Sequence, residues 1–295
     1  MGDLKDKAAV LTEVSLILAA VFWGLNYVAT KYAADFFPQL FIVALRFNVG
    51  GLLLLSVLRF LEPESKLSRK DVLPMLGLGC FGIGAAQTAF TFGVSTTSAA
   101  STGLVFATAP VWGMLLGSVL GLEQARLKGI LGVGLSVVGV GIVFYGGLLG
   151  ATDDSLAGDL LVLVAAVCVG AYTVFSMPML DRHSPLAVAT YPTLFGGPVV
   201  LLLSSPYLVD VEWASASVGA WATVGYSAVF ATALAFAGWQ RGISRVGANK
   251  VLVYQYLITF TGVASGVVLL GESLSANKLL GGAVILLGVY LARRQ

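Results

Sequence analysis

The sequence predicts an all-α membrane protein with ten transmembrane helices, arranged as a 5+5 inverted-topology repeat with both termini cytoplasmic. Three observations lead to this prediction: long runs without charged residues, a one-sided distribution of Lys and Arg among the loops, and a resemblance between the two halves of the chain. The 295-residue chain is 58% hydrophobic and only 11% charged, whereas soluble domains carry roughly 25% charged residues. This composition excludes a disordered chain, a nucleic-acid binder and a secreted disulfide scaffold.

The charge-free runs are long enough to cross a bilayer many times. A hydrocarbon core about 30 Å thick needs roughly 20 apolar helical residues, and the whole of 72–122 contains no Asp, Glu, Lys or Arg. The segment 38–60 is apolar except for Arg46. We expect helices at about 13–33, 38–60, 72–95, 98–121, 128–147, 157–180, 185–205, 215–241, 247–271 and 276–293.

The loops between these helices differ sharply in their positive charge. Of the 17 Lys and Arg, 14 lie at the termini or in alternate connections, and the other connections hold only Lys31 and Lys278. Short cytoplasmic loops carry an excess of Lys and Arg, so both termini are expected in the cytoplasm. The polar segment 1–12 precedes the first apolar run, and no small-residue cleavage site follows that run. We therefore expect an uncleaved multi-pass protein of the cell (inner or plasma) membrane.

The second half of the chain repeats features of the first. Because each half has five helices, the second copy enters the membrane from the opposite side, and inverted repeats are a recurrent plan of secondary transporters. The predicted units are a cytoplasmic segment 1–12, a first repeat 13–147, an extracytoplasmic linker 148–156 and a second repeat 157–293. With a shift of 149 residues the matches include Gly113 with Gly262, Gly117 with Gly266, Glu123 with Glu272, Gly132 with Gly281 and Gly139 with Gly288.

The small-residue pairs Gly113/Gly117 and Gly262/Gly266 lie on the fourth and ninth helices. Small residues at this spacing allow helix backbones to approach closely in lipid. They serve either simple tight packing or a contact between the repeats that moves during transport. Cys80 and Cys168 both fall within predicted spans and are interpreted as buried small residues, while His183 is interpreted as a solvated loop residue.

Several short motifs resemble those of EamA-type proteins. The first helix contains Trp23, Gly24 and Asn26, similar to the WGxN opening of that family, and Arg46 lies in a segment similar to its LRF motif. Pro110 matches the fourth-helix proline of the first EamA unit, although the second unit departs from this pattern with Thr259. The resemblance covers about 13–292 and points to the ten-helix branch of the drug/metabolite transporter superfamily. It implies a carrier of small metabolites, amino acids or drugs, often exported, and similar to bacterial amino-acid and metabolite exporters.

The chain shows no signature of an enzyme or of a cofactor site. It contains no HExxH, GxSxG or Walker A sequence, and no Asp or Glu is expected deep within a span. Proton- and sodium-coupled carriers commonly use an intramembrane carboxylate. We therefore expect facilitated diffusion or exchange, or proton coupling carried by a less obvious group, and neither a cofactor nor a metal.

Polar and aromatic side chains near the middle of the spans form the candidate substrate site. Arg46 is the one deep charge, and it either holds a substrate carboxylate by two hydrogen bonds or ties down carbonyls of a neighbouring helix. Each aromatic residue either lines the site or packs between helices, and Trp239 has a third possibility in the interfacial belt. The candidates are Trp23, Asn26, Tyr27, Arg46, Gln87, Phe90, Thr91, Phe106, Tyr172, Trp239, Tyr254 and Gln255.

Aromatic side chains with a few amides suit a neutral, zwitterionic or partly apolar metabolite. The leading prediction is a secondary transporter of an amino-acid-like solute that works by alternating access, in export or exchange. The alternative is a non-transporting scaffold or lipid-modifying factor that retains the fold. The expected partners are a small-molecule substrate and membrane lipid, without nucleic acid, and the protein is expected to be a monomer or a homodimer. The sharpest expectation is that Gln87 and Tyr172 both line one central cavity, and that removing either weakens transport more than folding.

Overall fold

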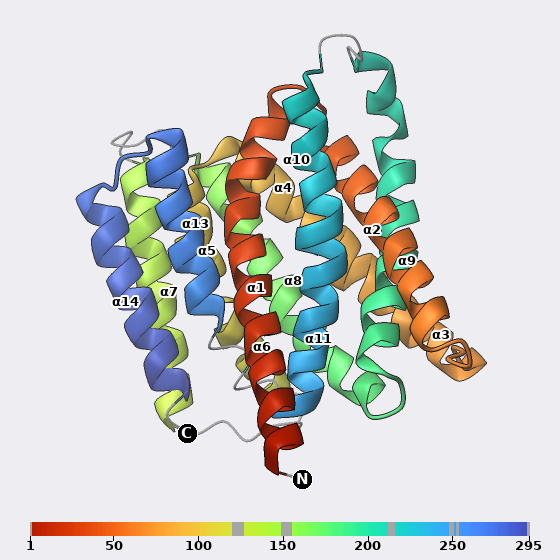
Figure 1. Cartoon of the computed structure of the whole chain (residues 1–295). Helices are drawn as coiled ribbons and strands as arrows, with labels where there is room; N and C mark the ends of the chain where they lie inside the picture. Colours follow the sequence, from red (N-terminus) through yellow and green to blue (C-terminus); the bar gives the residue numbers. More distant parts are fainter. Residues whose placement is uncertain are drawn as a thin grey trace.

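The computed structural model is a bundle of long helices (Figure 1) and describes residues 2–119, 127–148, 155–211, 216–247, 251 and 254–293. Within these ranges no strand occurs, and seven helical stretches are long and apolar enough to cross a membrane, together with three shorter apolar helices. The predicted linker 148–156 lies mostly outside the described residues, as do Glu123 and several of the loop charges. This is the fold of a multi-pass helical membrane protein.

The first half begins with α1 (Gly2–Ala34), which extends farther toward the N-terminus than the predicted start at 13. It continues through α2 (Gln39–Leu61), then α3 (Arg69–Gly77), the π-helical segment η1 (Leu78–Ala85) and α4 (Ala86–Thr96), which form one continuous span. The next span consists of α5 (Ala99–Phe106) and α6 (Ala109–Val119), and α7 (Leu127–Leu148) ends this half.

The second half has the same order of elements. It comprises α8 (Leu156–Leu180), then α9 (Pro185–Ser204) with the 3₁₀ segment η2 (Ser205–Asp210), and a span built from α10 (Val218–Ala228), the π-helical segment η3 (Val229–Leu234) and α11 (Ala235–Val246). The helices α13 (Gln255–Leu270) and α14 (Ala276–Arg293) follow. The ninth predicted helix therefore starts later than 247, and the eighth ends later than 241.

The fourth span is interrupted where the sequence prediction had one helix. Pro110 has no backbone N–H to donate and its ring crowds the preceding turn, so the regular helix stops at Phe106 and resumes at Ala109. The Thr108 hydroxyl donates to the carbonyl of Val105 at 2.7 Å. The break places a non-helical turn beside the centre of the bundle.

Equivalent helices of the two halves have equivalent packing partners, each in the opposite half. Helix α1 packs against α13 and α11, while its counterpart α8 packs against α6 and α4. The counterparts α2 and α9 pack on each other, and so do α7 and α14, which lie side by side at one edge of the bundle (Figure 1). Swapping the halves leaves this set of neighbours unchanged, as a two-fold relation between inverted repeats requires.

Two of the glycine pairs that match between the halves, Gly132/Gly281 and Gly139/Gly288, lie on α7 and α14, which pack against each other. A Cβ placed on Gly139 would be 2.7 Å from the backbone nitrogen of Ile285, and one on Gly281 would be 2.8 Å from the carbonyl oxygen of Gly139. Both distances are shorter than real Cβ contacts, so only glycine allows the two backbones to approach this closely. Gly139 and Gly281 are therefore explained by the close packing of α7 on α14.

Candidate functional site

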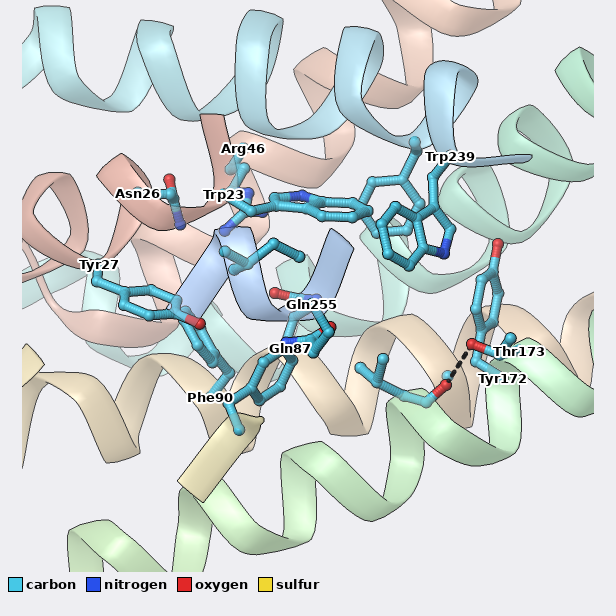
Figure 2. A pocket seen from close by; sticks show the side chains of 15 residues that line it. Trp23, Asn26, Tyr27, Arg46, Gln87, Phe90, Tyr172, Thr173, Trp239 and Gln255 are labelled. Carbon is cyan, nitrogen blue, oxygen red and sulfur yellow. Dashed lines mark hydrogen bonds between the residues drawn. The ribbon is translucent and has the colours of Figure 1, made fainter. Parts of the chain in front are cut away.

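A cavity lies at the centre of the bundle between the two halves of the chain (Figure 2). The space open to the centres of water-sized molecules is about 60 Å³, and one water needs roughly 10–15 Å³ on this measure. The cavity as it stands therefore accommodates a few waters or part of a small solute. Its lining consists of Trp23, Asn26, Tyr27, Arg46, Gly82, Gln87, Phe90, Phe106, Val169, Tyr172, Thr173, Phe236, Trp239, Gln255 and Ile258.

Most of the candidate residues from the sequence lie in this one cavity, and two do not. Thr91 is buried but outside the lining, and Tyr254 packs against the neighbouring hydrophobic cluster. Each follows or precedes a true lining residue, Phe90 or Gln255, and one residue along a helix turns the side chain by about 100°. Thr91 and Tyr254 therefore lie outside this lining, and their part in substrate binding stays a prediction.

Five lining residues were not expected from the sequence. Phe236 and Ile258 lie three residues from Trp239 and Gln255, and so share their helix faces. A Cβ on Gly82 would collide with the ring of Tyr172, which explains why glycine stands there. The helical spacing was a usable signal for the first two, whereas Gly82, Val169 and Thr173 carry no side chain that sequence reasoning singles out.

Aromatic rings form two walls of the cavity. Trp23 meets Trp239 at 5.0 Å and Phe236 at 5.5 Å between ring centroids, both edge to face. Phe90 meets Tyr27 and Phe106 at 5.4 Å each on the other side. Such pairs are favourable and rigid, so the walls present a preformed apolar surface. Trp239 belongs to the cavity and not to an interfacial belt.

Arg46 is buried and bound to the π-helical segment η3. Its Nε donates to the Thr232 hydroxyl at 2.8 Å, and its Nη2 donates to the Ala231 carbonyl at 3.2 Å. The indole nitrogen of Trp23 donates to the same carbonyl at 2.8 Å. Arg46 therefore ties down a neighbouring helix, as one of its two proposed roles required, and it also lines the cavity.

Two further polar lining residues are engaged by the protein. The Asn26 carbonyl oxygen accepts from the Ser227 hydroxyl at 2.7 Å, and its amide donates to Thr30 at 3.2 Å. The Tyr172 hydroxyl accepts from the amide of Gln240 at 2.9 Å. Asn26 thus connects α1 to α10, and Tyr172 connects α8 to α11, so both hold helices in place as well as lining the cavity.

Two buried polar atoms at the cavity have no hydrogen-bond partner among the described residues. They are the hydroxyl of Tyr27 and the amide nitrogen of Gln255, whose residues are 1% and 3% exposed. An unpaired buried donor is costly, which makes both atoms candidates for bonding a ligand. Figure 2 shows both side chains, with Gln87, pointing toward the middle of the pocket.

Polar clusters connect the two halves at each end of the bundle. At the end that holds the start of α1, Asp71 forms an ion pair with Arg182 at 2.6 Å and a contact with His183 at 2.9 Å. In the same region Ser184 donates to Glu62. His183 is therefore a partner of Asp71, and its interpretation as a solvated loop residue was wrong.

The second cluster lies at the opposite end. Lys31 forms an ion pair with Glu272 at 3.3 Å and donates to the Thr97 carbonyl at 2.8 Å. The Thr97 hydroxyl donates to Asp159 at 2.8 Å, and Lys278 donates to the Ser98 hydroxyl at 3.0 Å. Asp159 is fully buried in the first turn of α8, where a carboxylate interacts favourably with the helix dipole. The contacts Lys31–Glu272, Thr97–Asp159 and Lys278–Ser98 each join one half to the other.

A helical bundle of apolar spans around a central cavity defines a multi-pass membrane protein with a site for a small solute. The sequence profile of the EamA-like transporter family matches the chain twice, at residues 10–145 and 156–294. The chain therefore belongs to the EamA-like transporter family. It is a membrane transporter and not an enzyme, and its substrate class is a small molecule.

Two relatives whose names describe exporters match nearly the whole chain and support this assignment. A probable terminal-alkyne amino-acid exporter of Streptantibioticus cattleyicolor is 28% identical over 282 residues, covering 95% of this chain and 93% of the relative. A probable amino-acid metabolite efflux pump of Salmonella typhimurium is 28% identical over 287 residues, covering 93% and 92%. A crystal structure with 20% sequence identity superimposes with a TM-score of 0.68 over 95% of each chain, which shows the shared fold.

Proposed function

We propose that this protein is a secondary transporter that moves a small neutral, zwitterionic or partly apolar metabolite, such as an amino acid, across the cell membrane. One observation carries the proposal: a cavity between the two halves, walled by aromatic rings and holding buried donors without partners among the described residues. A scaffold protein has no need to keep such donors unpaired, because apolar side chains of similar shape at these positions remove their cost. The names of the exporter relatives favour export or exchange.

The proposed mechanism is alternating access between two inverted repeats, 13–147 and 157–293, in a ten-span topology with both termini cytoplasmic. The exchange of packing partners between the halves supports this arrangement. The Asp71 and Lys31 clusters join the halves at opposite ends of the bundle, so each is suited to close the cavity on one side. Opening to one side then requires one cluster to break while the other holds.

The test is a flux assay with a panel of labelled amino acids, their amides and small apolar metabolites in proteoliposomes of purified protein. We expect counterflow of at least one amino-acid-like solute above protein-free vesicles. Uphill accumulation driven by a pH gradient alone would contradict uncoupled diffusion or exchange. Saturable binding without flux for every solute in the panel would favour the scaffold alternative.

The topology has its own test. A single cysteine introduced near each terminus, in a background with Cys80 and Cys168 replaced by Ala, is treated with a membrane-impermeant thiol reagent in whole cells and in lysed cells. We expect both terminal cysteines to react only after lysis. Labelling of either one in whole cells contradicts the cytoplasmic placement of that terminus.

A further inference from the structure

We propose that the cavity recognises its substrate through a carboxylate, and that a substrate ammonium is dispensable. This inference rests on the proposed transport function and specifies which substrates that function takes. Among the described residues that line the cavity, Arg46 is the only charged one, and no Asp or Glu is present. The fixed charge of the lining is therefore positive, which favours an anionic group over a cationic one.

Arg46 keeps donors available for such an anion. A guanidinium carries five N–H groups, and the bonds to Thr232 and Ala231 use two of them. These bonds also fix the plane of the group, since both acceptors lie in the same π-helical segment. A planar guanidinium with free N–H groups matches the two oxygens of a carboxylate.

The two unpaired buried atoms add donors of the same kind. The Tyr27 hydroxyl and the Gln255 amide nitrogen both carry hydrogens with no partner among the described residues. An ionised carboxylate only accepts hydrogen bonds and offers about four lone-pair positions, so it can satisfy both atoms. In Figure 2 the side chains of Arg46 and Tyr27 lie toward the left of the pocket, Tyr172 lies at the right, and Gln255 lies between them.

Three acceptors of the lining already accept a hydrogen bond from the protein. The Asn26 oxygen accepts from Ser227, the Val169 carbonyl accepts from Thr173, and the Tyr172 hydroxyl accepts from Gln240. An ammonium has three donors and no acceptor, so in this lining it is left mainly with the amide oxygens of Gln87 and Gln255. The faces of the aromatic rings also attract an ammonium, but Arg46 repels it, and no carboxylate of the described lining offsets that repulsion.

The aromatic walls specify the rest of the substrate. Trp23, Phe236 and Trp239 on one side and Phe90 and Phe106 on the other leave an apolar space between them. An aromatic or branched side chain gains from burial against these rings. The expected substrates are monocarboxylates with such a side chain, including amino acids and acids that lack the amino group.

The first experiment measures competition in proteoliposomes that take up labelled phenylalanine at pH 7. Unlabelled 3-phenylpropionate has the carboxylate without the ammonium, and 2-phenylethylamine has the ammonium without the carboxylate. We expect 3-phenylpropionate to inhibit at least tenfold more strongly than 2-phenylethylamine. Equal inhibition by the two compounds, or stronger inhibition by the amine, overturns the inference.

Two variants assign the effect to the cavity. Tyr27→Phe removes one donor and should weaken inhibition by 3-phenylpropionate roughly tenfold to a hundredfold, as expected for a hydrogen bond to a charged group. Gln255→Glu places a negative charge at nearly constant volume and should reverse the preference toward the amine. The matched control Gln39→Glu makes the same charge change outside the cavity and should leave the preference as in the wild type. Wild-type preference in both cavity variants contradicts the assignment.

A binding measurement separates this inference from the proposed function. The melting temperature of the purified protein in detergent is recorded with 3-phenylpropionate and with 2-phenylethylamine, because a ligand that binds only the folded state stabilises it. If no compound is transported but 3-phenylpropionate alone raises the melting temperature, transport fails while the carboxylate selectivity stands. If phenylalanine is transported and 3-phenylpropionate neither competes nor stabilises, the selectivity fails while transport stands. If neither compound competes or stabilises and nothing is transported, both fail.

Discussion

Replacing Gly170 by alanine should force apart the two helices that cross beside the cavity. Gly170 lies on α8, and a Cβ at this position would be 2.6 Å from the backbone nitrogen of Gly113 and 2.7 Å from the carbonyl oxygen of Ala109, both on α6. Ordinary van der Waals contact begins at 3.4 Å. Because backbone atoms cannot rotate away as side chains do, α8 and α6 must separate by about 0.7–0.8 Å, or one helix must bend.

The expected cost follows from this overlap. Overpacking of a close contact typically destabilises a protein by about 1–3 kcal/mol, while alanine gains up to about 1 kcal/mol over glycine in helix propensity. Gly225→Ala on α10 is the matched control, because nothing lies within 4 Å of a Cβ there and only the propensity gain applies. The difference between the two variants, about 1–3 kcal/mol, isolates the steric term.

The assay is reversible unfolding of both variants in the same mixed detergent micelles, together with flux in proteoliposomes. Gly170→Ala should also reduce flux, because Tyr172 and Thr173 follow it on α8 and line the cavity. Unfolding free energies of the two variants within about 0.5 kcal/mol of each other would show that the helices relax without cost. That result would refute the argument that this crossing depends on glycine.

Three further predictions concern contacts at and around the cavity. Tyr172→Phe leaves the buried Gln240 amide without its acceptor and should lower the unfolding free energy by about 1–3 kcal/mol. In the same unfolding assay, the double variant Tyr172→Phe with Gln240→Leu should recover most of that loss. Additive losses from the two substitutions would contradict this prediction. Gln87→Leu should keep the melting temperature within a few degrees while flux falls several-fold, and unchanged flux would remove Gln87 from the site. Lys31→Met breaks the ion pair with Glu272. A cysteine introduced at position 98 should then react faster with a water-soluble thiol reagent. Unchanged reactivity would contradict a closing role for this cluster.

The spans and most of the site could be predicted because their signals are local in the sequence. Apolar runs identify the helices, and a polar or aromatic residue in mid-span already suggests a cavity. Trp23 and Tyr27 are four residues apart and therefore share one helix face, and both line the cavity. Thr91 and Tyr254 lie outside the lining, because each is rotated by about 100° along its helix from a lining residue, Phe90 or Gln255.

The roles of the site residues could not be predicted in the same way, because their partners are remote. Asn26 accepts a hydrogen bond from Ser227, and Tyr172 accepts one from Gln240, which lies 68 residues away. No spacing in the sequence predicts either contact. The earlier expectation that Tyr172 matters for transport more than for folding now needs revision, since its hydroxyl satisfies a buried amide. For Gln87 that expectation is unaltered and stays a prediction.

The two halves use one backbone plan but stabilise it with different side chains. Each third helix contains a π-helical segment, η1 or η3, and such segments are frequent at functional sites. In η1, Gly79 lies directly on α9, where a Cβ would be 2.5 Å from the Pro192 carbonyl oxygen. In η3, the Ala231 carbonyl instead accepts bonds from Trp23 and Arg46 of the other half.

This difference bears on how the proposed carrier works. In the described lining, the only charge is bonded to the π-helical segment of the second half, and the first half has no equivalent bond because its contact is made through glycine. A movement of η3 relative to α2 must therefore either break the hydrogen bonds of Arg46 or move Arg46 together with η3. A movement of η1 relative to α9 involves no such bonds. The two access states of an alternating carrier built this way differ in energy, even though the backbone repeats are related. A substrate carboxylate on Arg46 would act on that difference directly, since it binds the group that holds η3 to the first half.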